Sequence, residues 1–217
     1  AKSFSEKGLV SQEEFLNALD IDKFKDKYSF LREFPQDTTL EGFLFPDTYL
    51  MPPGKSAEFY IDVLLKRFED IYFNKVDSVI KENKIELTPY QVVTLASIVE
   101  GEAKLEEERP VIAGVFHNRL RIGMPLQSCA TVAYALGEHK EVLSLDDLEI
   151  DSPYNTYKNN GLPPGPIGAP GLSSMLAVAN PAKVDYLYFV AKGDGSHIFS
   201  VTFDDHLKAQ KMIESQK

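Results

Sequence analysis

One carboxylate of this sequence, that of Glu100, falls within the apolar face of a predicted helix. Residues 88–100 read TPYQVVTLASIVE, and at about 100° per residue Glu100 projects between Val93 and Ala96. A carboxylate held against aliphatic side chains loses solvation, so we expect burial to raise the pKa of Glu100. A carboxylic acid that keeps its proton near neutral pH can protonate a leaving group. The position therefore makes Glu100 a candidate general acid.

Two structural explanations compete with this chemical interpretation of Glu100. A glutamate near the end of an apolar helix can extend its carboxylate into water, or it can pair with a nearby arginine. Glu102 offers an internal comparison, because it lies nearer the polar edge of the same helix. If one of the two carboxylates does chemistry, Glu100 is the stronger candidate.

The helix that ends with these glutamates has clear start signals. Thr88 is suited to cap it, Pro89 suits the first helical position, and Gln91 can reach back to complete a capping box. A second helix is predicted over about residues 107–121, where apolar residues recur every four positions. The helix that carries Glu100 is expected to belong to a helical core.

Two polar segments follow, and each has a structural explanation. His117, Asn118 and Arg119 come late in the second helix, where a polar cluster alone indicates a solvated last turn. The loop at residues 152–157 combines a proline with Tyr, Asn and Thr side chains. Such a loop can bind an extended polar polymer, with tyrosine rings against sugar rings, or it can be a strap over the core. The sequence leaves both interpretations open.

The remaining patterns predict a helix-rich α+β fold. A long helix is expected over about residues 56–83, and short extended strands, bent at Pro46, are expected around residues 40–50. Residues 186–191 and 197–201 predict a C-terminal hairpin, which a terminal helix follows.

Composition excludes several classes of protein. The 217 residues can bury a core as one large domain, or as one domain with a smaller piece. The net charge of −10 argues against a nucleic-acid binder, whose affinity needs a basic surface. Cys129 is the single cysteine, which excludes an intrachain disulfide framework, and no metal-ligand motif such as HExxH occurs. From the single cysteine and the lack of a metal-ligand motif we expect no metal, and we expect no cofactor. No stretch reaches the roughly 20 apolar residues of a membrane span.

Five motifs, taken together and in order, resemble the signatures of one bacterial enzyme family. They are LEGFLFPDTY at 40–49, LASIVEGEA at 95–103, VFHNRLRIGMPLQS at 115–128, SPYNTY at 152–157 and GLPPGPI at 161–167. With these motifs the chain resembles the YceG-like endolytic murein transglycosylases, the MltG family, from about residue 40 to its end. The agreement of five motifs in order and spacing is specific, although each alone is weak.

The resemblance implies a lyase, namely a lytic transglycosylase that cleaves peptidoglycan glycan strands internally, between N-acetylmuramic acid and N-acetylglucosamine. The product carries a 1,6-anhydro ring, so no water enters the bond. The resemblance also implies a catalytic domain over residues 41–217, preceded by the C-terminal part of a LysM-like subdomain at residues 1–40. Glu100 is implied as the single general acid/base, in agreement with the expectation from its apolar setting.

The resemblance carries a set of substrate-binding residues onto this sequence as well. It implies polar contacts with the glycan from Glu102, Asn118, Arg119, Gln127, Tyr154, Asn155, Thr156 and Tyr157. Where many relatives have an acidic residue after Gln-Ser, this chain has Cys129.

The implied partners are peptidoglycan glycan strands, with a peptidoglycan synthase as a candidate protein partner and no nucleic acid. Members of the family are held in the inner membrane by an N-terminal helix. The resemblance therefore implies an extracytoplasmic location on a single-pass anchor that this chain lacks. Two other functions stay open: a peptidoglycan-binding module without turnover, and an ordinary glycoside hydrolase in which another carboxylate, such as Asp151 or Glu102, activates water.

Overall fold

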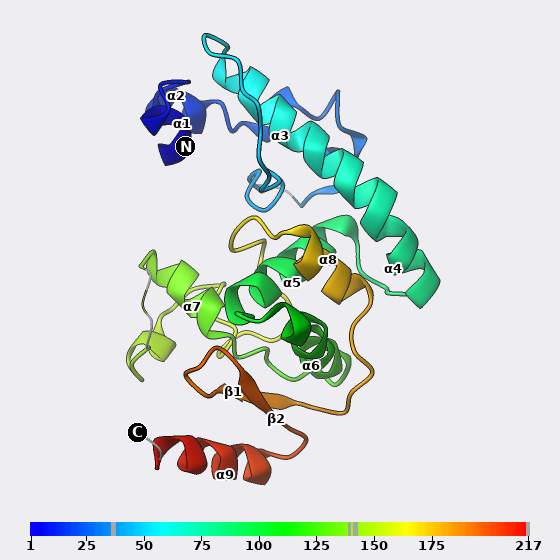
Figure 1. Ribbon diagram of the computed structural model, residues 1–217, viewed down its shortest axis with the longest axis vertical. Helices are drawn as coiled ribbons and strands as arrows, with labels where there is room; N and C mark the ends of the chain where they lie inside the picture. The colour runs from blue at the N-terminus through cyan, green and yellow to red at the C-terminus, as the bar shows by residue number, and fades with distance from the viewer. Residues whose placement is uncertain (36–37, 139, 141–142, 216–217) are drawn as a thin grey trace.

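The computed structural model describes residues 1–35, 38–138, 140 and 143–215. Figure 1 shows a helical body in which α5, α6, α7 and α8 lie together, with α3 on one side and a hairpin followed by α9 on the other. The α-helices and strands are α1 Lys2–Glu6, α2 Gln12–Asn17, α3 Ala57–Ile71, α4 Asp77–Asn83, α5 Pro89–Glu102, α6 Arg109–Arg121, α7 Cys129–Leu136, α8 Leu172–Ala179, β1 Tyr188–Ala191, β2 His197–Ser200 and α9 Phe203–Glu214.

Helix α5 is the centre of this body, because α6, α7 and α8 all pack against it. Its predicted capping box is confirmed: the Thr88 hydroxyl accepts from the Gln91 amide, and the Gln91 side chain accepts from the Thr88 amide. Every residue from 92 to 99 is buried. The prediction of one apolar face is therefore wrong, since neighbouring helices and the loop segment that contains Ile167 both cover this part of α5.

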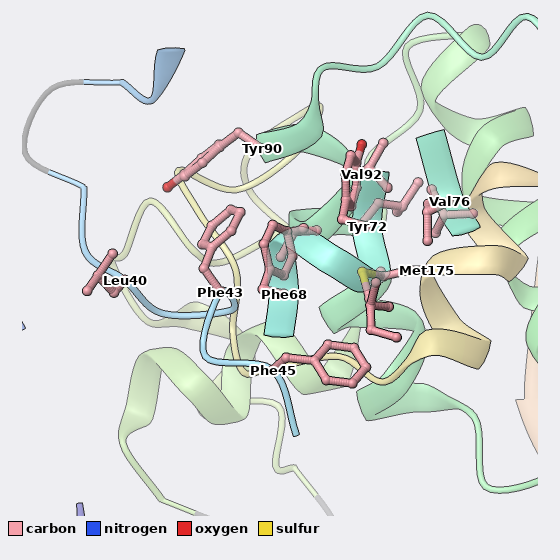
Figure 2. Packing of buried hydrophobic residues seen from close by; sticks show 14 of the residues in the cluster. Leu40, Phe43, Phe45, Phe68, Tyr72, Val76, Tyr90, Val92 and Met175 are labelled. Carbon is pink, nitrogen blue, oxygen red and sulfur yellow. The ribbon is translucent and has the colours of Figure 1, made fainter. Parts of the chain in front are cut away.

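An aromatic cluster joins the N-terminal part of the chain to α5. Phe43 lies with its ring centroid 5.0 Å from that of Phe68 in α3 and 5.7 Å from that of Tyr90 in α5 (Figure 2). Phe30 in turn lies 5.3 Å from Phe68. Buried apolar contacts thus continue across residue 40, and the domain boundary expected there stays a prediction. So does the LysM-like assignment of residues 1–40.

The long predicted helix over residues 56–83 is present but not uniform. It consists of α3, capped by Ser56, a single π-helical segment over Tyr72–Val76, and α4. The predicted strands around residues 40–50 are wrong, because these residues form a turn and then an extended segment that pairs with no strand of the described chain. The Tyr49 hydroxyl donates instead to the carbonyl of Phe45, 2.6 Å away.

The C-terminal hairpin is confirmed, with Tyr188 opposite Ser200 and Ala191 opposite His197 in an antiparallel register. Helix α9 packs on both strands and begins after Thr202, whose side chain accepts from the Asp205 amide. The helix-rich α+β fold class is confirmed. Among the described residues, none of the helices combines the length and apolar character that a membrane crossing requires.

Gly114 lets α6 approach the segment before the hairpin. A Cβ atom at this position would lie 2.6 Å from the backbone carbonyl oxygen of Ala182, which cannot move aside as a side chain can. Gly114→Ala is therefore expected to reduce the free energy of unfolding by about 1–3 kcal/mol in urea titrations. Gly168→Ala is the matched control, because a Cβ there meets no atom within 4 Å. Equal stability of both variants would contradict the close approach.

Candidate active site

The carboxylate of Glu100 emerges at the last turn of α5 and is held by groups from two other helices. Its Oε2 accepts from the Ser174 hydroxyl at 2.8 Å and from the Gly171 amide at 3.1 Å, both at the start of α8. Its Oε1 accepts from Arg109 Nη2, in α6, at 3.2 Å. The N-terminal end of α8 favours negative charge through its free N–H groups. Glu100 is thus fixed in orientation as an anion.

The expectation that Glu100 is buried with a raised pKa is wrong for the free protein. Its side chain is 39% exposed. Partial burial does raise the pKa, but the hydrogen bonds from Ser174 and Gly171, together with the charge of Arg109, outweigh burial and hold the pKa below its ordinary value. The alternative interpretation of an arginine-paired glutamate is the one observed. Pairing does not remove the side chain from solvent, so an incoming ligand can still reach it.

The lowered pKa of Glu100 predicts a specific pH dependence of stability. A carboxylate whose pKa is lower in the folded than in the unfolded protein stabilises the fold at any pH above its unfolded pKa, which is near 4.5. This contribution is lost as the pH falls through the pKa of the folded state. The stability difference between the native chain and Glu100→Gln should therefore be constant from pH 7 to about 5 and shrink below it. Urea unfolding at pH 7, 5 and 3 measures this difference. A difference that grows toward acid would contradict the lowered pKa.

Arg109 lies within reach of Glu100 because contacts with the C-terminal hairpin hold the start of α6 in place. The preceding residue, Glu108, accepts from the backbone amide of His197 at 3.0 Å and contacts its ring Nδ1 at 2.6 Å. Both side chains are largely buried. This contact joins the hairpin to the first turn of α6. It thereby sets the position from which Arg109 extends its guanidinium.

Glu102 lies two residues after Glu100 in α5 but has a different environment. One of its oxygens accepts from the Ser128 hydroxyl and from the Ala130 amide, the latter at 3.1 Å. Glu102 therefore caps the start of α7. The close α5–α7 contact depends on Gly101, where a Cβ would lie 2.8 Å from the Cβ of Ala130. The second oxygen of Glu102 is the one that remains for a ligand.

Asn118 and Arg119 are buried, so the interpretation of a solvated last turn is wrong for both. The Asn118 amide donates to the carbonyls of Val184 and Tyr186, at 2.8 and 3.1 Å. The Arg119 guanidinium is part of a side chain 5% exposed, and burial lowers its pKa. It donates to Leu187 O at 2.6 Å and to the carbonyls that follow α6. Both residues bind the chain before the hairpin to α6.

The predicted residues of the 152–157 loop divide into two groups. Asn155 and Thr156 are buried: the Asn155 amide donates to carbonyls of residues 148 and 150, and Thr156 accepts from the Ser128 amide. This part of the loop acts as a strap. Tyr154 and Tyr157 are half-buried. The Tyr154 ring lies 4.9 Å from that of Tyr134, which is partly exposed.

Gln127 is the one exposed residue among the predicted binding residues. It is exposed, and its side-chain oxygen accepts from Arg119 at 3.1 Å. Its backbone has a φ of 49°, a left-handed conformation that is uncommon for residues other than glycine. Glu102 and Gln127 therefore lie beside the start of α7, whereas Glu100 lies beside the starts of α6 and α8. Four other predicted residues lie within the scaffold, namely Asn118, Arg119, Asn155 and Thr156.

Among the described residues, no group of three or more His, Cys, Asp or Glu side chains is arranged to hold a metal ion. Cys129 is exposed at the start of α7, and its Sγ lies 3.2 Å from the Tyr157 hydroxyl. The site offers an oriented carboxylate, that of Glu100, with hydrogen-bonding neighbours.

Comparison with known proteins places this chain in a family. A profile of the YceG-like family matches residues 2–212. The chain belongs to the YceG-like family. The resemblance in the five motifs is thereby confirmed.

Similar proteins support the assignment to the YceG-like family. The chain is 40% identical over 229 residues to a Bacillus subtilis (strain 168) protein named endolytic murein transglycosylase, covering 100% of this chain and 62% of that protein. A Streptococcus pneumoniae (strain ATCC BAA-255 / R6) protein of the same name is 40% identical over 176 residues, covering 77% of this chain and 31% of that protein. A 2.6 Å crystal structure of a YceG-like protein from Listeria monocytogenes superimposes with a TM-score of 0.81 at 40% identity, covering 92% and 67% of the two chains.

The sequence alone did not predict the three residues that hold Glu100 in this YceG-like chain. Arg109 lies nine residues after Glu100, and Gly171 and Ser174 lie 71 and 74 residues after it. The one available signal was general: a glutamate in an apolar helix needs a partner. Which arginine and which helix start supply it depends on how α6 and α8 cross α5.

Proposed function

We propose that this chain is the catalytic part of an endolytic murein transglycosylase, with Glu100 as the single general acid/base. The observation that carries the proposal is the Glu100 carboxylate, oriented by Ser174, Gly171 and Arg109 yet partly exposed. Relatives at 40% identity bear this activity in their names. The chain spans 62% of the Bacillus subtilis relative, so the assignment of that activity to this chain is our proposal.

The reaction needs only one carboxyl group. Protonated Glu100 donates its proton to the glycosidic oxygen as the bond from this oxygen to the anomeric carbon breaks. The 6-hydroxyl oxygen of the same N-acetylmuramic acid then bonds to that carbon, and Glu100, now a carboxylate, accepts the hydroxyl proton. The carboxyl group ends as it began and no water is consumed. A retaining hydrolase would need a second carboxylate as nucleophile.

Glycan binding must supply the protonated form of Glu100, because the free protein favours the carboxylate. A sugar that covers the 39% exposed side chain removes water from it and makes its charge more costly. Binding and protonation are therefore coupled in this proposal. Glu100 thus becomes protonated only when a glycosidic oxygen is in place to receive the proton.

Glycan contacts are assigned to the predicted residues that keep accessible groups. Tyr154 and Tyr157 offer rings and hydroxyls, Gln127 an exposed amide, and Glu102 its second oxygen. Asn118, Arg119, Asn155 and Thr156 act on the substrate indirectly, through the scaffold that they hold. The full-length protein is proposed to work on the extracytoplasmic face of the membrane on a single-pass anchor, with a peptidoglycan synthase as its protein partner.

The products of purified glycan strands test this function against its alternatives. Mass spectrometry of the digest should find new ends that carry 1,6-anhydro-N-acetylmuramic acid. New reducing ends would instead identify a hydrolase. Intact strands that remain bound to the protein would identify a binding module. Either of the last two results overturns the proposed reaction.

A further inference from the structure

The two oxygens of Glu100 are held unequally. Oε2 accepts two hydrogen bonds, from Ser174 and Gly171, whereas Oε1 accepts one, from Arg109. A carboxylate oxygen has two lone pairs, so Oε1 keeps one that is free of these partners. The bond to Arg109 is also the longest of the three, at 3.2 Å. Oε1 is therefore the oxygen on which a proton is most readily accommodated.

Arg109 has a second carboxylate within reach. Its Nη1 donates to Glu106 Oε1 at 3.2 Å, and its Nε donates to the Ser174 hydroxyl at 3.0 Å. The Arg109 side chain is 11% exposed, whereas that of Glu106 is 75% exposed. A largely buried guanidinium is costly to leave without an anion. Glu106 can compensate the charge of Arg109 when Glu100 becomes neutral, and Ser173 already donates to Glu106 at 3.3 Å.

We propose that Arg109 is a positioning residue shared by two carboxylates: it contacts both Glu100 and Glu106 while Glu100 is ionised, and it pairs with Glu106 alone when Oε1 of Glu100 carries the proton. Ser174 and Gly171 keep Oε2 in place in both states, so the carboxyl group does not rotate during the exchange. This inference rests on the proposed function, because the proton on Oε1 is the one delivered to the glycosidic oxygen.

The other groups around Glu100 do not offer the same exchange. Helix α8 carries no charged residue, and α7 contributes only Cys129 and Tyr134 as titratable groups. On α5 itself, Glu102 is engaged at the start of α7. In the turn before α6, Glu108 is engaged with His197, and Glu107 is exposed and forms no ion pair within the described chain. Arg109 and Glu106 are therefore the pair to test.

Two substitutions with opposite expected effects test this exchange. Arg109→Gln removes the cation and should raise the pKa of Glu100, whereas Glu106→Gln removes the alternative anion and should lower it. The Glu100 carboxyl is titrated directly by carbon NMR of glutamate-labelled protein, with its signal assigned by its loss in Glu100→Gln. Glu107→Gln is the control, since it removes the same charge from the same turn without touching Arg109.

The pH profile of glycan cleavage gives the second readout. Activity requires protonated Glu100, so its decline toward alkaline pH should move to higher pH in Arg109→Gln and to lower pH in Glu106→Gln, with no change in Glu107→Gln. At its optimum, Arg109→Gln should lose roughly 10- to 100-fold in kcat, because the carboxyl is less well oriented.

Three results would overturn the inference. An unchanged Glu100 titration in both variants would leave Arg109 a purely structural residue. Shifts in the same direction in both variants, or an equal shift in Glu107→Gln, would show a general charge effect in place of an exchange. Failure of the proposed function is seen separately, as an absence of anhydro ends in the digest by the native chain. In that case the proton on Oε1 of Glu100 would have no role in glycan cleavage. Because Glu106 is exposed, its variant remains informative if Arg109→Gln does not fold.

Discussion

Replacing Glu100 with glutamine is expected to lower the rate of anhydro-end formation about 10³-fold. Glutamine keeps the shape of the side chain and can still accept from Ser174 and Gly171, but it neither donates nor takes up the transferred proton. The rate is measured from anhydro products released from purified glycan strands. Because Glu100 acts in both halves of the proposed reaction, no other carboxylate replaces it.

The interpretation of this result requires that the variant stays folded and binds glycan. Far-UV circular dichroism and strand sedimentation should show the native fold and retained binding for Glu100→Gln. Glu107→Gln, an equal change at an exposed site seven residues on, should keep the native rate. A Glu100→Gln protein that still forms anhydro ends at more than about a tenth of the native rate would exclude Glu100 as the acid/base.

Replacing Arg119 with methionine is expected to reduce the free energy of unfolding by about 3 kcal/mol. Methionine fills a similar volume but donates no hydrogen bond. The carbonyls of Pro125, Leu126 and Leu187 would then lose their donor within the core, and Tyr188 would lose the cation that lies 5.3 Å from its ring centroid. Urea unfolding measures the loss.

Arg121→Met is the matched control for this substitution. Arg121 lies in the same turn of α6 but is exposed, and it donates to Asn118 Oδ1 at 2.9 Å. Its loss should cost about 0.5 kcal/mol. If Arg119→Met is as stable as Arg121→Met but binds glycan more weakly, Arg119 belongs to the substrate-binding surface, as the family resemblance implied, and the scaffold role assigned to it here is wrong.

Local signals in the sequence were sufficient for most elements of the fold. The capping box of Thr88 and Gln91, the cap at Ser56 and the hairpin over residues 186–201 each depend on neighbours within a few residues. The strands expected around residues 40–50 failed because a strand needs a partner. Apolar and aromatic side chains in an extended segment indicate burial, but they do not say whether another strand lies beside it.

The candidate site was predicted less completely than the fold. The sequence made Glu100 a candidate, but it did not predict the surroundings of this carboxylate, because its partners come from the starts of α6 and α8. The same limit affected Asn118 and Arg119. Their polarity suggested water, but the carbonyls that they bind lie up to 68 residues away. Polar groups whose partners are backbone carbonyls of distant segments leave no periodic signal in the sequence.

The central claim is that the sugar's own hydroxyl, and no water molecule, closes on the anomeric carbon under the control of Glu100. Cleavage of glycan strands in water enriched in heavy oxygen tests this claim most directly. The predicted result is that mass spectrometry finds new ends in the anhydro form, with no heavy oxygen incorporated. New ends that carry one heavy oxygen would show that water entered the bond, and would contradict the account.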